Sequence, residues 1–333
     1  MKIFRRILLI ILCIALLVIA AGYVLPRNVH VERKLVMNVS QKTIFNQVNT
    51  LKNWTKWLPW LQKDTSLHIL CSGPESGVGA TLKWLSSDKN IGSGSVSIIS
   101  GIVSDSLEVV FDFAEKGKST GKFIFLKANE GIIVTYILAS DLGMNPISRW
   151  FGLFSDRLIG PDIEQSLYNL KELVHDTKAI YGYEIVDYKL PARTLITIRD
   201  TASPETVTPK LALTYKKISL FLKSKNLSPS GNPMAVFHQY SNQGFDIEAG
   251  LPVISIIAVP EGLNCSEREA ERTLMIKYIG SYKMISSAYI ALQNYVDNNE
   301  LQRNGPGWEE YLTNPTIEAD SNKRQTNIYY PIK

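Results

Sequence analysis

Cysteine and histidine are scarce in this sequence, which has three cysteines and four histidines in 333 residues. Cys13 lies inside an apolar run, whereas Cys71 and Cys265 lie far apart in the chain, so no disulfide framework follows. The histidines are scattered singly, and none is paired at a metal-ligand spacing. The chain also lacks a Gly-x-Ser-x-Gly elbow and a Cys/His arrangement for covalent catalysis. We therefore expect no metal and no cofactor.

Clusters of positive charge are missing beyond the extreme N-terminus. The formal net charge is +5, and three of these charges come from Lys2, Arg5 and Arg6. A nucleic-acid-binding protein normally gathers lysine and arginine on one face to neutralise phosphates. No helix-turn-helix is recognisable, so no element is predicted to enter a DNA groove. We therefore expect no direct nucleic-acid partner.

A long apolar run follows the basic segment of residues 1–6. Residues 7–25 carry no charged side chain and approach the ~20 residues that a helix needs to cross a bilayer. Basic residues before the run favour a cytoplasmic N-terminus, with the remaining chain on the extracytoplasmic side. A cleaved signal peptide is the first alternative, because Ala20-Ala21-Gly22 offers small residues at a plausible cleavage point. A buried core helix is the second, and basic residues after the run weaken the assignment of sidedness. We expect an uncleaved single-pass membrane anchor in contact with the lipid bilayer.

The chain from residue 26 to residue 178 is predicted to form an α+β domain. Apolar residues alternate with polar ones from Val29 onward and again in several runs separated by glycine, asparagine or aspartate, as in an antiparallel meander. An amphipathic helix follows, in which Ile163, Leu167, Leu170 and Val174 share one face. One long helix against one curved antiparallel sheet is the predicted architecture.

The pattern restarts near Tyr183 and is repeated within the second half of the chain. Arg193-Thr194-Leu195 and Arg272-Thr273-Leu274 each begin a β-rich run. Each run is followed by an apolar-periodic helix, with Tyr215 and Tyr289 at the second position of the two helical stripes. Similarity in both the tripeptide and the element that follows it indicates an internally duplicated unit.

Three motifs mark the first half of the chain: the tryptophan-rich Asn53–Trp60 segment, the Ser72–Ala80 turn before a strand containing Trp84, and the helix Gly160–Leu173. Through these motifs, residues 26–178 resemble the START-like, polyketide-cyclase (SRPBCC) superfamily. This resemblance implies a helix-grip fold with an apolar cavity and no shared catalytic set. Trp54, Trp57 and Trp60 could line a cavity mouth, but tryptophans at this spacing more often pack a core.

Four segments of the second half form a recognisable series, namely Phe245–Val253, Gly280-Ser281-Tyr282, Gly307–Pro315 and Ile328–Ile332. By their order and approximate spacing, residues 183–333 look like the GyrI-like, AraC-type effector-binding domain. The resemblance implies a duplicated β-α-β-β unit around a small-molecule pocket, with Glu309 as the pocket carboxylate. The chain departs from the family at Tyr278, where members often carry histidine, so any role of that imidazole is in doubt here.

The expected ligand follows from the chemistry of such a pocket. A carboxylate among aromatic rings is costly to desolvate unless a cation or hydrogen bond compensates, and the ring faces also favour positive charge. Glu309, Trp308, Tyr311, Tyr282 and Tyr240 are therefore expected to bind an apolar or cationic aromatic small molecule.

Three other interpretations of the same residues stay open. In the first, Glu309 is a solvated turn residue and the tyrosines pack a core. In the second, the chain is a small-molecule hydrolase of the GyrI-like kind, with Glu309 as the general base that activates water; this needs a raised carboxylate pKa. In the third, the chain is a scaffold whose pockets have collapsed.

Overall fold

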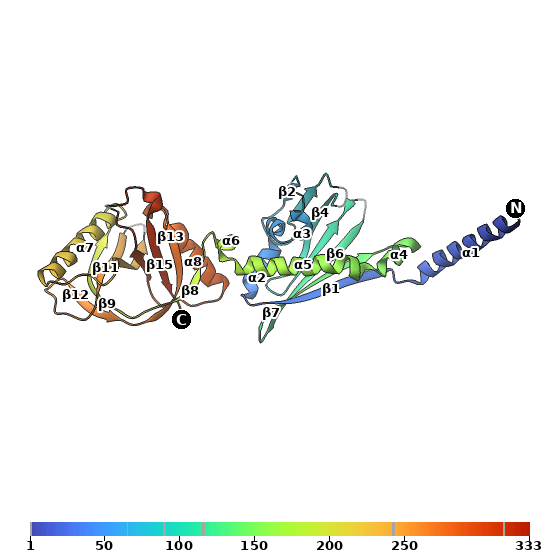
Figure 1. Cartoon of the computed structure of the whole chain (residues 1–333). Helices are drawn as coiled ribbons and strands as arrows, with labels where there is room; N and C mark the ends of the chain where they lie inside the picture. The colour runs from blue at the N-terminus through green and yellow to red at the C-terminus, as the bar shows by residue number, and fades with distance from the viewer. Residues whose placement is uncertain (1, 65, 89–90, 115–116, 242–243, 316) are drawn as a thin grey trace. The chain divides into compact units, whose positions relative to one another are not determined.

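The computed structural model describes residues 2–64, 66–88, 91–114, 117–241, 244–315 and 317–333 (Figure 1). The chain divides into two compact units, Met1–His175 and Asp176–Lys333. Each unit contains one antiparallel sheet with helices beside it, so the fold class is α+β.

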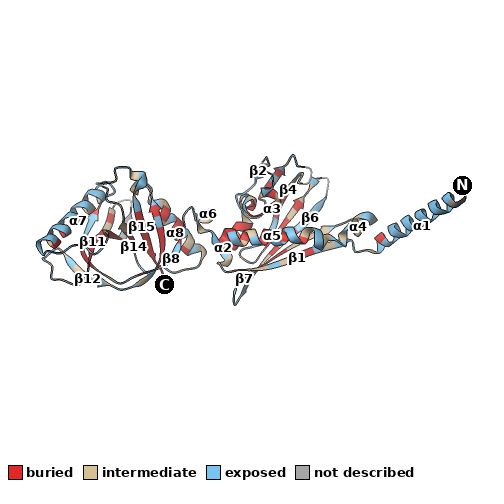
Figure 2. Cartoon of the chain, viewed as in Figure 1, coloured by how far each residue is buried: buried red, intermediate tan, exposed pale blue. Residues whose placement is uncertain are grey.

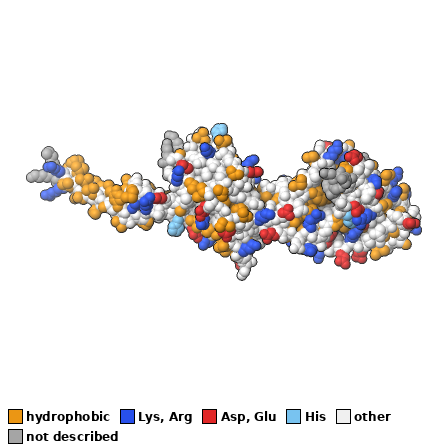
Figure 3. Space-filling model, turned by 180° about the vertical axis from the view of Figure 1, so that it is seen from behind, with side chains coloured by type: hydrophobic (Ala, Val, Ile, Leu, Met, Phe, Trp, Pro, Cys, Tyr) orange, Lys and Arg blue, Asp and Glu red, His pale blue; other side chains and the backbone are white. Residues whose placement is uncertain are grey.

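The first unit begins with helix α1 (Lys2–Val24), which is apolar around almost its whole circumference. Its segment Phe4–Val24 has a mean hydropathy of 3.1 and is long and apolar enough to cross a membrane. The residues of α1 are exposed along most of its length (Figure 2), and hydrophobic side chains dominate its surface (Figure 3). Gly22, near the end of the helix, is buried instead.

Seven antiparallel strands form the sheet of the first unit in the order β1-β7-β6-β5-β4-β3-β2. The strands are β1 (Asn28–Met37), β2 (His68–Ser72), β3 (Thr81–Leu85), β4 (Ser93–Ile102), β5 (Ser106–Asp112), β6 (Lys118–Ala128) and β7 (Gly131–Asp141). Alternating burial along β5 shows one face turned to the core, as the period of two in the sequence predicts.

The helices of the first unit are α2 (Gln41–Asn49), η1 (Leu51–Lys56), α3 (Pro59–Gln62), α4 (Pro146–Gly152) and α5 (Ser155–His175). The long helix α5 packs against β1 (Figure 1), and the predicted apolar stripe is its buried face. Arg33 on β1 pairs with Asp156 in the first turn of α5, with 2.7 Å between Nη1 and Oδ1. Helix α5 therefore covers the sheet through both apolar packing and an ion pair.

Aromatic rings fill the core of this unit beneath η1. Trp54 and Trp57 are fully buried, with their ring centroids 5.0 Å apart, and both contact the ring of Phe123. Trp60 is only partly buried, and its ring lies 4.7 Å from that of Trp84. The first two tryptophans of the segment are thus core residues.

The second unit contains an eight-stranded sheet in the order β12-β9-β11-β10-β14-β15-β13-β8. The strands are β8 (Val186–Leu190), β9 (Arg193–Ala202), β10 (Met234–Ser241), β11 (Gly244–Val253), β12 (Asn264–Arg268), β13 (Glu271–Ile279), β14 (Gly307–Tyr311) and β15 (Gln325–Pro331). Its helical segments are α6 (Thr177–Tyr181), α7 (Val207–Ser224), η3 (Tyr282–Met284), α8 (Ser286–Asn298) and η4 (Ser321–Lys323).

The two halves of this sheet contain the same order of elements. The segments β9-α7-β10-β11 and β13-α8-β14-β15 follow one another in sequence, and β10 pairs with β14 at the middle of the sheet. The strand that precedes each segment pairs with the other one: β8 pairs with β13, and β12 pairs with β9.

The two faces of this sheet have different surroundings. Helix α8 packs over residues that include Leu274 and Ile328, and α7 packs over residues that include Ile196 and Leu251, so both helices lie on one face. The opposite face carries a separate buried cluster of Leu190, Leu195, Met234, Val236, Met275, Trp308 and Tyr329. A residue's place in the alternation along a strand therefore decides which environment its side chain enters.

Candidate ligand-binding site

Strand β14 positions Glu309 at the centre of the second sheet. Glu309 lies opposite Ala235 of β10 on one side and opposite Ile328 of β15 on the other. A Cβ atom at Gly307 would lie only 2.9 Å from the ring of Tyr289, so glycine at this position lets that ring approach β14. The strand thus holds Glu309 on the face that α7 and α8 cover.

Two tyrosine hydroxyl groups donate hydrogen bonds to the Glu309 carboxylate. Tyr289 of α8 donates to Oε1 at 3.1 Å, and Tyr311 of β14 donates to Oε2 at 2.7 Å. The ring of Tyr282 lies 5.6 Å from that of Tyr311, and the ring of Tyr215 lies 6.3 Å from it. We call these five residues the Glu309 cluster.

Burial is the dominant influence on the Glu309 carboxylate, which is only 5% exposed. Desolvation raises the pKa of Glu309 to about 7, while the hydrogen bonds from Tyr311 and Tyr289 act in the opposite direction. Among the described residues, Glu309 has no cationic partner in a hydrogen bond or ion pair. The group can therefore exchange a proton near neutral pH, and its anion would be stabilised by an added positive charge.

The structure brings together some of the predicted site residues and separates others. Tyr282 and Tyr311 lie in the Glu309 cluster. Trp308 points to the opposite face of the sheet, where the guanidinium of Arg268 lies 5.6 Å from its ring. Alternation along the strand separates Trp308 from Glu309, because neighbouring side chains point to opposite faces. The side chain of Tyr240 lies outside the described part of the chain.

Tyr215 and Tyr289 belong to the cluster although they were not among the predicted ligand-binding residues. A signal for both was available, because they hold the same place in the helical stripes of the two repeats. Tyr278 donates a hydrogen bond to the carbonyl oxygen of Ser281 at 2.8 Å. It thereby secures the turn that precedes Tyr282.

A second buried carboxylate, Glu248 of β11, has a different environment. It accepts hydrogen bonds from Thr197, His238 and Arg268 at 2.9, 2.9 and 2.5 Å. Burial acts to raise the pKa of Glu248, but hydrogen bonds from these donors and the charge of Arg268 outweigh it, so the pKa is lowered. Glu248 is therefore a compensated anion, whereas Glu309 is not compensated by a cation.

Glu309 lines neither of the following two hollows, which are formed by described residues. One of about 440 Å³ in the second unit is lined by Phe237, His238, Arg303, Gly305 and Pro306. The other, of about 650 Å³, lies beside β2, β3 and β4 of the first unit, and Ile69, Trp84 and Leu85 contribute to its lining. The Nε1 atom of Trp84 is buried and has no hydrogen-bond partner within the described residues.

No group of three histidine, cysteine, aspartate or glutamate residues is arranged to hold a metal ion in the described ranges. The buried carboxylates Glu248 and Glu309 instead meet hydroxyl, imidazole and guanidinium groups. The chemistry available at Glu309 is therefore that of a carboxylate and phenols.

Solved structures with similarity to the chain cover about half of it. They include the C-terminal domain of EcmrR (16% identity, TM-score 0.38, 45% of this chain and 98% of that chain). Protein SA2116 from Staphylococcus aureus has 9% identity and a TM-score of 0.36, over 44% of this chain and 94% of that one. A hydrolase from Listeria innocua has 9% identity and a TM-score of 0.37, over 48% and 98%. No curated protein matches the sequence.

A known protein family matches the second half of the chain. The START-like resemblance of residues 26–178 stays a prediction. Residues 183–333 match the family described as the GyrI-like small molecule binding domain. The second half of this chain is therefore a GyrI-like small-molecule-binding domain.

Proposed function

We propose that the protein is a membrane-tethered sensor or carrier whose Glu309 cluster binds a flat, apolar, cationic small molecule. One observation carries this proposal: the buried Glu309 carboxylate meets two phenolic donors and no described cation. The remaining stabilisation of the anion would come from the ligand.

Both the Glu309 carboxylate and the tyrosine rings of the cluster favour a cation with aromatic character. A positive charge near Glu309 offsets the cost of burying its anion, and the faces of tyrosine rings attract positive charge by about 0.5–2 kcal/mol each. Rings at different angles also offer stacking and edge contacts, since Tyr282 and Tyr311 are inclined by 77° to each other. A planar cation matches these features better than an anion or a sugar.

Entry of such a ligand requires a ring to move, because Glu309 is closed off from solvent. Tyr282 lies on the three-residue η3 and is half-buried, whereas Tyr215 and Tyr289 lie on the longer helices α7 and α8. Tyr282 is thus the ring whose displacement disturbs the fewest backbone hydrogen bonds. We assign it as the point of entry.

A comparison of Glu309→Gln with Glu310→Gln tests the binding proposal. Glu310 is the matched control: it is the next residue of β14, but its carboxylate accepts from Tyr329, Asn327 and Asn232 on the other face. Binding of a cationic aromatic dye and of its neutral analogue would be measured by fluorescence titration. We expect Glu309→Gln to weaken only the cationic dye, and Glu310→Gln to change neither affinity. Equal affinity of wild type and Glu309→Gln for the cation would refute the proposal.

The second candidate is a small-molecule hydrolase with Glu309 as general base. The specific observation in its favour is the pKa of Glu309 near 7, which suits a group that takes a proton from water at neutral pH. Tyr311 or Tyr289 would polarise the substrate. The variant Glu309→Gln distinguishes the two functions. If Glu309 is the general base, the wild type turns over a substrate and the variant does not. If Glu309 only binds the ligand, the wild type shows no turnover.

Helix α1 is proposed to anchor the protein in a bilayer through residues 7–25, with both units on the extracytoplasmic side. Its length, hydropathy and preceding basic residues support this assignment. Mass spectrometry of the mature protein distinguishes an anchor from a cleaved signal peptide. Protease treatment of intact and opened cells tests the sidedness.

The hollow of the first unit is proposed to accept an apolar molecule that carries one hydrogen-bond acceptor. Its lining is apolar around Ile69 and Leu85, and the Nε1–H group of Trp84 has no described partner. A buried donor without a partner costs about 1–3 kcal/mol, which an acceptor on the ligand would recover. Native mass spectrometry of the protein with retained cellular ligands tests this site.

A further inference from the structure

Helix α4 docks against the C-terminal part of α1 through three kinds of contact. The indole Nε1 of Trp150 donates to the carbonyl oxygen of Val18 at 2.9 Å. The Arg149 guanidinium donates to the carbonyl oxygens of Tyr23 and Leu25 at 2.8 and 3.2 Å, which satisfies acceptors at the end of α1. A Cβ atom at Gly22 would lie 2.7 Å from Pro146, so the glycine permits close packing. The position of α4 along α1 is therefore defined.

This contact sets the depth of α4 if α1 crosses a bilayer. At 1.5 Å per residue, Phe4–Val24 is about 31 Å long, close to the ~30 Å hydrocarbon thickness. Val18 lies about 9 Å before Val24 along the helix axis. Trp150 is bonded at that level, so α4 would lie at the depth of the headgroups and outer acyl chains.

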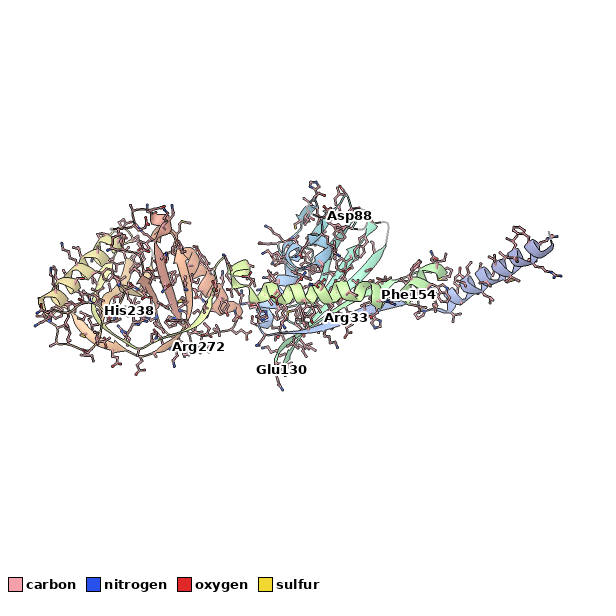
Figure 4. The ribbon with its side chains drawn as sticks, in the orientation of Figure 1. Arg33, Asp88, Glu130, Phe154, His238 and Arg272 are labelled. Atoms are coloured by element: carbon pink, nitrogen blue, oxygen red, sulfur yellow. The ribbon has the colours of Figure 1, made fainter. Side chains whose placement is uncertain are left out.

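The residues that α4 and the start of α5 expose suit this depth. Large apolar side chains here are between 52% and 66% exposed, namely those of Met144, Ile147, Phe151, Leu153, Phe154 and Leu158. We call these six residues the α4–α5 patch. Figure 4 labels Phe154, which lies where α4 ends and α5 begins.

The spacing within the α4–α5 patch places apolar side chains together on each helical segment. Ile147 and Phe151 are four residues apart on α4, and Phe154 and Leu158 are four residues apart where α5 begins, so each pair lies on one face of its segment. Burying this apolar surface out of water would stabilise the protein by about 25 cal/mol per Å². The acidic group nearest to it, Asp156, is neutralised by Arg33, whereas Arg157 is exposed and free to approach anionic headgroups.

We infer that the α4–α5 patch inserts into the interfacial layer of the same membrane that α1 crosses, and that it seats the first unit on the bilayer surface. This inference rests on the proposed anchor. The occupant is lipid rather than a second copy of the chain, because the contacts to Val18 and Gly22 bring the patch to the level of the acyl chains. Tryptophan at position 150 also matches the preference of indole rings for the interface.

The test uses the full chain in phospholipid vesicles that contain an anionic lipid. Cys13, Cys71 and Cys265 are first replaced by alanine, and single cysteines are then introduced by Phe151→Cys, Phe154→Cys and Val103→Cys for an environment-sensitive fluorophore. Val103 is the control, because it is 81% exposed and adjoins Ser104, which accepts a hydrogen bond from Gln41 of α2. Strand β1 connects α1 to α2, and its ten residues span about 33 Å. A label at position 103, beside α2, is therefore expected to stay away from the bilayer.

We expect blue-shifted emission and several-fold stronger quenching by shallow lipid-attached quenchers at positions 151 and 154, and neither at position 103. The patch proposal is overturned if all three labels are equally open to an aqueous quencher while the protein resists alkaline carbonate extraction. If alkaline carbonate extracts the protein from the vesicles, the proposed membrane anchor itself is wrong. A blue shift at 151 and 154 that disappears as the lipid-to-protein ratio rises identifies a second copy, and also overturns the proposal.

Discussion

The hydroxyl group of Tyr311 donates a 2.7 Å hydrogen bond to Oε2 of Glu309, two residues earlier on the same strand. Residues at this separation point to the same face of a sheet, so the Glu-x-Tyr spacing brings a phenol to the carboxylate without help from another strand. Tyr289 reaches the other oxygen from helix α8. Each oxygen of Glu309 therefore has its own donor, and each donor can be removed separately.

The stability of the second unit should fall as pH rises through the range in which Glu309 ionises. Raising its pKa from 4.5 to about 7 means that the folded state holds a proton that the unfolded state has lost, so the unfolding free energy decreases with pH in this window. The decrease is about 3 kcal/mol at most, with no further loss from this group above the folded pKa. Denaturant unfolding of residues 176–333, followed by Trp308 fluorescence, measures it. Glu309→Gln should reduce the slope between pH 5 and 7, and an unchanged slope would assign it to other groups.

Affinity for a cationic aromatic dye should rise with pH because only the ionised carboxylate attracts the cation. With a pKa of about 7, ionisation of Glu309 increases about tenfold between pH 6 and pH 8. The dissociation constant should fall by a similar factor in wild type and stay level in Glu309→Gln. A neutral dye of the same shape serves as the control, and an equal pH response for both dyes would contradict the role of charge.

Removing one phenolic donor should move the pH midpoint of dye binding upward. The hydrogen bonds from Tyr311 and Tyr289 both lower the pKa of Glu309, so Tyr311→Phe and Tyr289→Phe should each raise it. A hydrogen bond to a charged group contributes about 1.5–3 kcal/mol, which corresponds to a midpoint change of about one pH unit or more. Tyr295→Phe is the control, since Tyr295 also lies on α8 but packs against Tyr181. A midpoint that stays at the wild-type value in Tyr311→Phe would show that this bond does not tune the carboxylate.

The Glu248 network predicts different costs for two arginine substitutions. Arg268→Met leaves a buried carboxylate without its strongest donor and should destabilise the second unit by about 1–3 kcal/mol at neutral pH. Because the pKa of Glu248 is lowered in the fold, its contribution is present above its ordinary pKa of 4.5 and is lost as pH falls further, so the cost should shrink only below about pH 4.5. Arg272→Met is the matched control, because its partner Asp187 is exposed and such pairs contribute about 0–1 kcal/mol. Equal effects of the two substitutions would be inconsistent with a structural role for the network.

Two tryptophans of the first unit should respond differently to truncation. Trp54 is fully buried and donates from Nε1 to the carbonyl oxygen of Val48 at 2.7 Å, so Trp54→Ala should cost about 3–5 kcal/mol. Trp60 is partly exposed, and Trp60→Ala should cost less. Calorimetric unfolding of residues 26–333 compares them. Similar losses for both variants would mean that Trp60 is also a core residue.

Local patterns predicted the elements of this fold better than their pairings. The apolar stripe of α5 and the repeated strand-helix order of the second half follow from periodicity, which depends only on neighbouring residues. Strand β2 gave no such signal, because all five of its residues are exposed and no alternation marks a buried face. Pairings such as β8 with β13 join residues far apart in sequence, and periodicity carries no information about them.

In the candidate site too, local patterns predicted some residues, whereas others depend on distant contacts. Glu309, Tyr311 and Tyr282 could be predicted, because a family motif fixes their order and β14 fixes the spacing of the first two. Trp308 could have been assigned to the other face if residues 307–311 had been interpreted as a strand, since alternation separates neighbours. Tyr289 needed the packing of α8 on the sheet, and that packing depends on tertiary contacts.

The exchanged outer strands of the second sheet have a consequence for how this unit folds. Strand β8 precedes β9 in sequence but pairs with β13, and β12 precedes β13 but pairs with β9. Neither half of the sheet therefore has all of its hydrogen-bonded neighbours until the other half is also present. The two repeats should therefore melt as a single cooperative block, with hydrogen-exchange protection lost together rather than in two steps. Such distant pairings also raise contact order, so refolding is expected to be slower than for a helical bundle of equal length.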